Sequence, residues 1–263
     1  MWSGLLSRVV VTIVALPGVI ALVYLGGWWI AILALGVAFL ALHEYAEVIR
    51  PLRPLVLACY VGALAVVLGA QLGGLEWMVA GFLSTLVVVF VLQGLAGTRQ
   101  ATTAIASTVL GTAWIAFGLG HVLLIRDIPD DGRLAIFTVL MCVYAADTVA
   151  YFVGRLFGRH KLSPVISPGK TWEGFVAGTA AAIVVAFFAL YDQGFLAGWE
   201  SLVLGAAIAL SGVAGDLFVS VIKRDMQVKD TGRLLAAHGG VLDRIDSLLF
   251  AGPAAFYVIV AVH

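Results

Sequence analysis

Residues 215–246, GDLFVSVIKRDMQVKDTGRLLAAHGGVLDRID, form the longest segment in which charges interrupt an otherwise apolar chain of 263 residues. This segment holds five of the fifteen acidic residues and five of the fifteen basic residues. Charges at or near a membrane are costly unless they are paired or bound to an ion. So many of them in one place indicate a chemical function.

Three polar residues in the first part of this segment share one helix face. Asp216 lies at the end of an apolar run, and Ser220 and Lys223 follow at i+4 and i+7. This spacing places a carboxylate, a hydroxyl and an ammonium on one side of the helix. Asp216 is therefore a candidate functional acid at the membrane boundary.

The second part of the segment combines a glycine pair with two acids. Gly239 and Gly240 allow positive φ, so backbone N–H groups there can approach an anion closely. A helix should follow, with Asp243 and Asp246 three residues apart on one face. These two carboxylates and Asp216 form a candidate site for a hard divalent cation.

The same segment supplies positive charges for anionic substrates. The candidate phosphate-binding bases are Lys223, Arg224, Lys229 and Arg244. Asp230 could orient Lys229 or contact a nucleotide, and His238 either anchors its loop by a hydrogen bond or contacts a phosphate directly. Acids around a cation, with bases beside them, indicate metal-assisted phosphoryl or nucleotidyl transfer.

The segment closely resembles the signature of the phosphatidate cytidylyltransferases, also called CDP-diacylglycerol synthases. The resemblance is carried by residues 220–224 (SVIKR), 229–232 (KDTG) and 238–246 (HGGVLDRID). One departure is Ala236, where the family usually has proline or glycine. This difference loosens a turn and removes no chemical group.

Composition predicts an all-α, polytopic membrane protein, since 62% of the residues are apolar and only 11% are charged. About nine runs reach the roughly 20 residues that cross a bilayer. They lie at about 5–25, 28–48, 53–70, 76–95, 102–125, 134–156, 174–192, 200–221 and 247–262. We expect about four N-terminal helices in residues 1–100, then a catalytic region, 101–263, with cytoplasmic loops 155–173 and 222–246.

The distribution of bases predicts the orientation. Thirteen of the fifteen lysines and arginines fall on the side of the N-terminus and the two motif loops, and only Arg126 and Arg133 fall on the other. By the positive-inside rule this side is cytoplasmic. We therefore expect a multi-pass protein of the cell inner membrane with its active site on the cytoplasmic side.

The sixth predicted span carries an acid inside an apolar run. Asp147 is followed by Tyr151 and Arg155 at i+4 and i+8, on one face that extends toward the cytoplasm. A structural interpretation would pair Asp147 with Arg155 through Tyr151. An intramembrane acid is a functional candidate by default, and we favour that interpretation.

The basic loop after this span, residues 159–173, is a second candidate for anion binding. Ser167 or Thr171 should cap the seventh span with Pro168 as an early helix residue, so that N–H groups and Lys170 face an anion. Alternatively, the loop only binds anionic lipid headgroups. Together with Asp147, it again resembles the cytidylyltransferase family.

Two further patterns suggest structural roles. His43, Glu44 and Glu47 end the second span, where an interfacial cluster is more often a solvated helix end than a polar cleft. Small residues in spans seven and eight favour close helix packing or a subunit interface, and hence a homodimer. They are Gly174, Gly178, Gly205, Gly212 and Gly215.

The resemblance implies that CTP and phosphatidic acid react at a lipid bilayer to give CDP-diacylglycerol and pyrophosphate, with Mg²⁺ and room for a second cation. It implies catalytic roles for Asp216, Asp243, Asp246, Lys223 and Asp147, and substrate binding by Lys170, Ser167, Arg224, Lys229, Asp230, His238, Gly239, Gly240 and Arg244. A CTP-dependent polyprenol-type lipid kinase and a secondary transporter are the alternatives. No nucleic-acid partner is expected.

Overall fold

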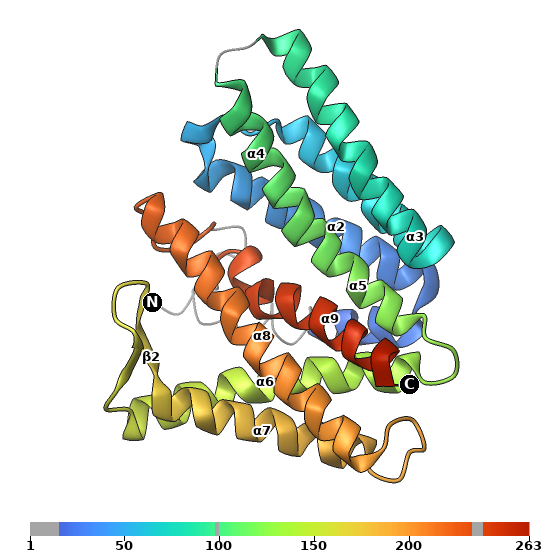
Figure 1. Cartoon of the computed structure of the whole chain (residues 1–263), viewed down its shortest axis with the longest axis vertical. Coiled ribbons are helices and arrows are strands. Elements are labelled where there is room, and N and C mark those ends of the chain that lie inside the picture. The colour runs from blue at the N-terminus through green and yellow to red at the C-terminus, as the bar shows by residue number, and fades with distance from the viewer. Residues whose placement is uncertain (1–15, 98–99, 233–238, 263) are drawn as a thin grey trace. The chain divides into compact units, whose positions relative to one another are not determined.

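The computed structural model describes residues 16–97, 100–232 and 239–262, and almost all of them are helical. The elements are a helical stretch Leu16–Leu25, α2 (Gly27–Val48), η1 (Arg50–Leu52), α3 (Val56–Ala96), α4 (Ala101–Gly111), the π-helical turn η2 (Thr112–Ala116), α5 (Phe117–Arg126), α6 (Gly132–Phe157), α7 (Trp172–Leu190), α8 (Gly198–Asp225) and α9 (Leu242–Val262). The predicted all-α class is confirmed (Figure 1).

Seven helices in the described part of the chain are long and apolar enough to cross a membrane. One of them, α3, has 41 residues and departs from helical geometry at Gly73 and Gly74, between the predicted spans at about 53–70 and 76–95. The chain is thus a multi-pass membrane protein. The count of nine stays a prediction, because most of the first predicted span lies outside the described residues.

A short hairpin precedes α7, formed by the antiparallel strands β1 (Lys161–Ser163) and β2 (Ser167–Thr171). Thr171 caps α7, since its Oγ1 accepts a hydrogen bond from Gly174 N at 3.2 Å. The predicted cap is confirmed for Thr171 and wrong for Ser167. Pro168 is also a strand residue and not an early helix residue, because strand pairing continues to the residue before the helix.

The chain divides into two compact units. The first comprises the described residues up to Asp127 and those from Met226 to Arg244, and the second comprises Ile128–Asp225 and the residues from Ile245 onwards. Helix α9 therefore begins in the first unit and continues in the second. The predicted division into N-terminal helices (1–100) and a catalytic region (101–263) stays a prediction.

In the second unit, α6 and α7 lie side by side, and α7 also packs on α8 (Figure 1). A Cβ added to Gly178 would approach the Ala146 carbonyl oxygen to 2.6 Å, and one on Gly205 would approach the Ala182 carbonyl oxygen to 2.8 Å. Such distances leave no room for a side chain. The predicted close packing of small residues is therefore confirmed within a single chain.

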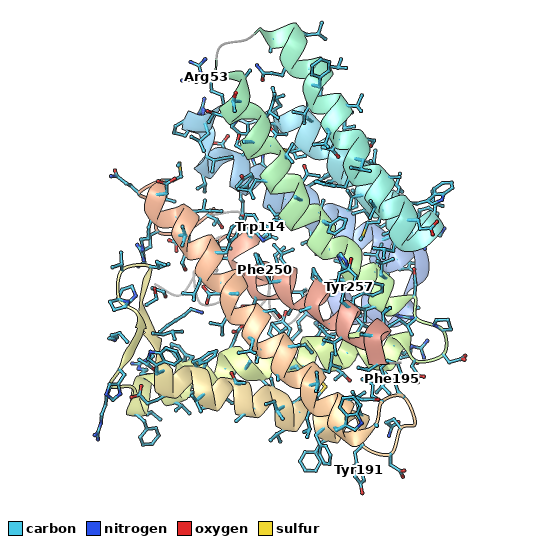
Figure 2. The ribbon with its side chains drawn as sticks, in the orientation of Figure 1. Arg53, Trp114, Tyr191, Phe195, Phe250 and Tyr257 are labelled. Carbon is cyan, nitrogen blue, oxygen red and sulfur yellow. The ribbon has the colours of Figure 1, made fainter. Side chains whose placement is uncertain are left out.

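In the first unit, the end of α2 is fixed by aromatic packing. Tyr45 is buried, its hydroxyl donates to the Ser107 carbonyl at 2.9 Å, and its ring meets Trp114 edge-on at 5.7 Å. Trp114, labelled in Figure 2, belongs to the π-helical turn η2. These contacts hold the C-terminal turns of α2 in one orientation.

Candidate active site

Asp216, in the second unit, lies at the centre of a group of polar side chains. Its Oδ2 pairs with Lys170 Nζ at 2.5 Å, and its Oδ1 accepts a hydrogen bond from Ser220 Oγ at 3.4 Å. The side chains of Lys170 and Asp216 keep 21% and 32% of their accessible surface, so the pair is only partly buried by the protein. The predicted alignment of Asp216 and Ser220 on one helix face is confirmed.

Two more acids interact with this pair. The Asp147 carboxylate accepts a hydrogen bond from the Ser247 side chain and interacts electrostatically with Lys170 and Asp216. Asp246 interacts with Asp216, Asp147 and Lys223, and its Oδ1 accepts from Ser247 N at 2.7 Å. We call the whole group the Asp216 cluster: Asp147, Lys170, Asp216, Ser220, Lys223, Asp246 and Ser247.

The structural alternative for Asp147 required a pairing with Arg155 through Tyr151. Arg155 Nη1 does donate to the Tyr151 hydroxyl at 2.8 Å. Asp147, however, interacts with the Asp216 cluster. The geometry thus favours the functional interpretation of this intramembrane acid.

Backbone packing holds the Asp216 cluster together. Gly215 lies so close to Asp246 that an added Cβ would collide with the Asp246 carbonyl oxygen. Phe218 of α8 packs on Phe250 of α9 with ring centroids 5.4 Å apart, and Phe250 is labelled in Figure 2. Arg224 Nε donates to the Ile166 carbonyl at 3.1 Å and so ties the end of α8 to the hairpin that carries Lys170.

The Asp216 cluster has the composition of a site for a cation shared with a substrate. It contains three acidic side chains and two lysines, so acidic groups outnumber basic ones. Among the described residues, no three His, Cys, Asp or Glu side chains are placed to hold a metal ion by themselves. Mg²⁺ is commonly bound through one or two carboxylates, with water and substrate phosphates completing its shell. The hard oxygen donors of the cluster fit that pattern.

Asp243 belongs to a different group, which lies in the first unit. Its Oδ2 accepts hydrogen bonds from Thr231 N at 2.9 Å and from Thr231 Oγ1 at 3.0 Å. Glu44 of α2 accepts from Val241 N at 3.0 Å and from Leu242 N at 2.9 Å. We call Glu44, Thr231, Gly232, Gly240, Val241, Leu242 and Asp243 the Glu44 cluster.

The prediction of a solvated helix end is wrong for Glu44, which is only 2% exposed. It remains correct for Glu47, which is exposed, and for His43, which is also exposed and lies 3.1 Å from the Tyr60 hydroxyl. The burial of Glu44 agrees with its position on α2. Glu44 follows the buried Ala41 by three residues, so it shares a face with the packed side of α2.

The other predicted substrate-binding residues remain predictions. Lys229, Asp230 and Arg244 are exposed, Ser167 lies in β2, and Gly239 has a φ of 82°. His238 lies outside the described residues. The predicted metal ligands Asp216 and Asp246 both belong to the Asp216 cluster, and the third, Asp243, belongs to the Glu44 cluster.

Several known proteins similar to this chain are named phosphatidate cytidylyltransferase. Residues 6–262 match the family model described as "Cytidylyltransferase family". A phosphatidate cytidylyltransferase of Mycobacterium leprae is 36% identical over 262 residues, covering 88% of this chain and 79% of that protein. Proteins of the same name from Haemophilus influenzae and Staphylococcus haemolyticus are 44% and 40% identical over 134 and 149 residues. These two alignments cover 49% and 56% of this chain, and 46% and 56% of the relatives.

Proposed function

Because the chain belongs to the cytidylyltransferase family, we propose that it transfers the cytidylyl group of CTP to phosphatidic acid. An oxygen of the lipid phosphate forms a bond to the α-phosphorus of CTP, the bond from that phosphorus to the β-phosphate oxygen breaks, and pyrophosphate leaves. The products are CDP-diacylglycerol and pyrophosphate. The observation that carries the proposal is the Asp216 cluster, which combines acids for a cation with lysines for phosphates.

The lipid phosphate is already an anion, so the reaction needs no strong general base. Its main obstacles are the repulsion between two polyanions and the charge that develops on the departing pyrophosphate. Lys170 and Lys223 would weaken the repulsion and stabilise the charge on pyrophosphate, because ammonium groups attract phosphate oxygens of either substrate. When a phosphate replaces Asp216 as the partner of Lys170, the ammonium group still has a negatively charged partner.

Asp216 and Asp246 are the residues we assign to a divalent cation, with Mg²⁺ as the expected ion and room for a second. When bound, such an ion supplies charge neutralisation and alignment of phosphate oxygens. Asp147 would support this pair through Ser247 and Lys170, with which it interacts. Asp243 as a further metal ligand, and Arg224, Lys229, Asp230, His238, Gly239, Gly240, Arg244 and Ser167 as substrate-binding residues, remain part of the proposal.

We place the chain in the cell inner membrane, and the positive-inside pattern supports an orientation in which the Asp216 cluster is reached from the cytoplasm, where CTP is available. A homodimer remains a proposal as well. The glycines that suggested a subunit interface, such as Gly178 and Gly205, pack against neighbouring helices of the same chain. A dimer would therefore have to use other surfaces.

The test is a pair of reactions with purified protein, phosphatidic acid, Mg²⁺ and CTP labelled at either the α- or the γ-phosphorus. We expect the α-label to appear in the lipid and the γ-label in pyrophosphate. A lipid kinase would instead transfer the γ-label to an alcohol lipid and leave the α-label in CDP. A transporter would move a solute across sealed vesicles without forming a labelled lipid. Either result would reject the proposal.

Sidedness is tested with the same α-labelled CTP and sealed membrane vesicles of opposite orientation. CTP does not cross a bilayer, so only the face that carries the site can use it. We expect labelled lipid with inside-out vesicles and none with right-side-out vesicles until detergent opens them. Labelling by intact right-side-out vesicles would contradict the cytoplasmic assignment.

A further inference from the structure

We infer that Glu44 is a positioning residue of the reaction: its buried carboxylate, from α2, binds the start of α9 and so places Asp243, which lies in the first turn of that helix. The expected effect of Glu44 on turnover rests on the proposed function. Its expected effect on the backbone at Val241 and Leu242 does not. Glu44 is 2% exposed and accepts hydrogen bonds from two consecutive backbone N–H groups, those of Val241 and Leu242. It lies almost 200 residues before them in the chain.

The two N–H groups bound by Glu44 stand where a helix ordinarily binds an anion. The first N–H groups of a helix have no partner within it, and the helix dipole adds positive potential there. Leu242 is the first residue of α9, and Val241 precedes it. A protein carboxylate therefore occupies the anion position beside Gly239 and Gly240. A substrate phosphate at Gly239 and Gly240 would therefore have to use N–H groups other than those of Val241 and Leu242.

Two glycines make room for this carboxylate. A Cβ added to Gly232 would collide with Glu44 Oε1, and one added to Gly240 would lie 2.6 Å from Glu44 Oε2. Side chains at these positions would push Glu44 out of its site. Glycine at 232 thus leaves room for Glu44, and glycine at 240 leaves room for both Glu44 and the Thr231 hydroxyl.

The contacts of Glu44 extend to Asp243 through Thr231. The Thr231 hydroxyl lies 3.0 Å from Asp243 Oδ2 and 3.4 Å from Glu44 Oε2. A hydroxyl has one proton to donate, so the shorter contact to Asp243 is the stronger of the two. Glu44 thus binds the backbone at the start of α9 and lies beside the Thr231 hydroxyl, which in turn contacts Asp243. Tyr45, next to Glu44, is itself held by Trp114 and Ser107.

The test compares Glu44→Gln and Glu44→Ala with Glu47→Gln, which changes an exposed acid three residues further along α2. The first measurement is amide hydrogen exchange, which needs no activity. We expect exchange at Val241 and Leu242 to rise about 10-fold or more in Glu44→Ala, because an amide without its acceptor opens more readily. The rise should be smaller in Glu44→Gln, whose single carbonyl oxygen still accepts. Exchange in α6–α8 should not change.

The second measurement separates positioning from simple loss of stability. For folded, monodisperse Glu44→Gln we expect kcat to fall about 10- to 100-fold, which corresponds to the loss of one hydrogen bond to a charged group. The KM for CTP should change little, and Glu44→Asp should recover part of the rate. A purely structural acid would lower the melting temperature and leave kcat per folded molecule as in the wild type.

Two results would overturn the inference. One is unchanged exchange at Val241 and Leu242 in Glu44→Ala. The other is a kcat for Glu44→Gln equal to that of Glu47→Gln. If the wild type forms no CDP-diacylglycerol, the proposed function fails, and the exchange measurement still decides whether Glu44 holds the loop.

Discussion

Asp216→Asn is expected to lower kcat/KM for CTP by more than about 100-fold, because losing a direct metal ligand should exceed the 10–100-fold typical of losing an outer-shell partner. Asparagine keeps the size of the side chain and one acceptor oxygen, so the hydrogen bond from Ser220 can survive. It removes the charge that pairs with Lys170 and that would attract a cation. The measurement is the initial rate of CDP-diacylglycerol formation at several CTP concentrations.

The matched control for this variant is Asp225→Asn. Asp225 is an exposed acid at the end of the same helix and belongs to neither polar cluster. We expect its rate to stay close to that of the wild type. A rate for Asp216→Asn within about fivefold of this control would remove Asp216 from the catalytic site, since a metal ligand contributes more than that.

Asp243→Asn is the second change with a large expected effect: we expect product formation to be abolished, with membrane insertion intact. If Asp243 acts through its negative charge, asparagine cannot replace it. The asparagine carbonyl oxygen can still accept a hydrogen bond from Thr231. The appropriate comparison is Thr231→Val, which removes the hydroxyl donor and keeps the Thr231 N–H. We expect Thr231→Val to lose only about 10-fold, the value of a typical single hydrogen bond.

The ratio between these two variants decides the role of Asp243. A much larger loss in Asp243→Asn than in Thr231→Val indicates that the negative charge takes part in the reaction. Equal losses would show that Asp243 only anchors the loop. Steady-state rates on folded protein of both variants, measured beside the wild type, give this ratio.

Much of the local structure could be predicted because it depends on short stretches of sequence. The break in α3 falls between two spans predicted from hydropathy, and the cap of α7 by Thr171 and the shared face of Asp216 and Ser220 follow from capping chemistry and helical spacing. Each involves residues within a few positions of one another. The composition likewise determined the fold class, since a chain this apolar has to bury its backbone hydrogen bonds within helices.

The contacts between residues far apart in the sequence could not be predicted in this way. The 2.5 Å pair of Lys170 and Asp216 joins a hairpin to a helix 46 residues later, and no local spacing specifies it. The sequence predicts a solvated Glu44, because it lies in an interfacial cluster beside Arg50 and Arg53, yet its own face of α2 is the packed one. Burial there is set by tertiary packing, which the local composition does not report.

The account depends on carboxylates of the Asp216 cluster binding a divalent ion, and the most direct measurement is the metal preference of Asp246→Cys. A thiolate favours a soft ion such as Cd²⁺ over Mg²⁺, and the native cysteines Cys59 and Cys142 are buried. We predict that the variant is inactive with Mg²⁺ and regains cytidylyl transfer with Cd²⁺, whereas the wild type prefers Mg²⁺. An unchanged ratio of the Cd²⁺ rate to the Mg²⁺ rate would contradict the account.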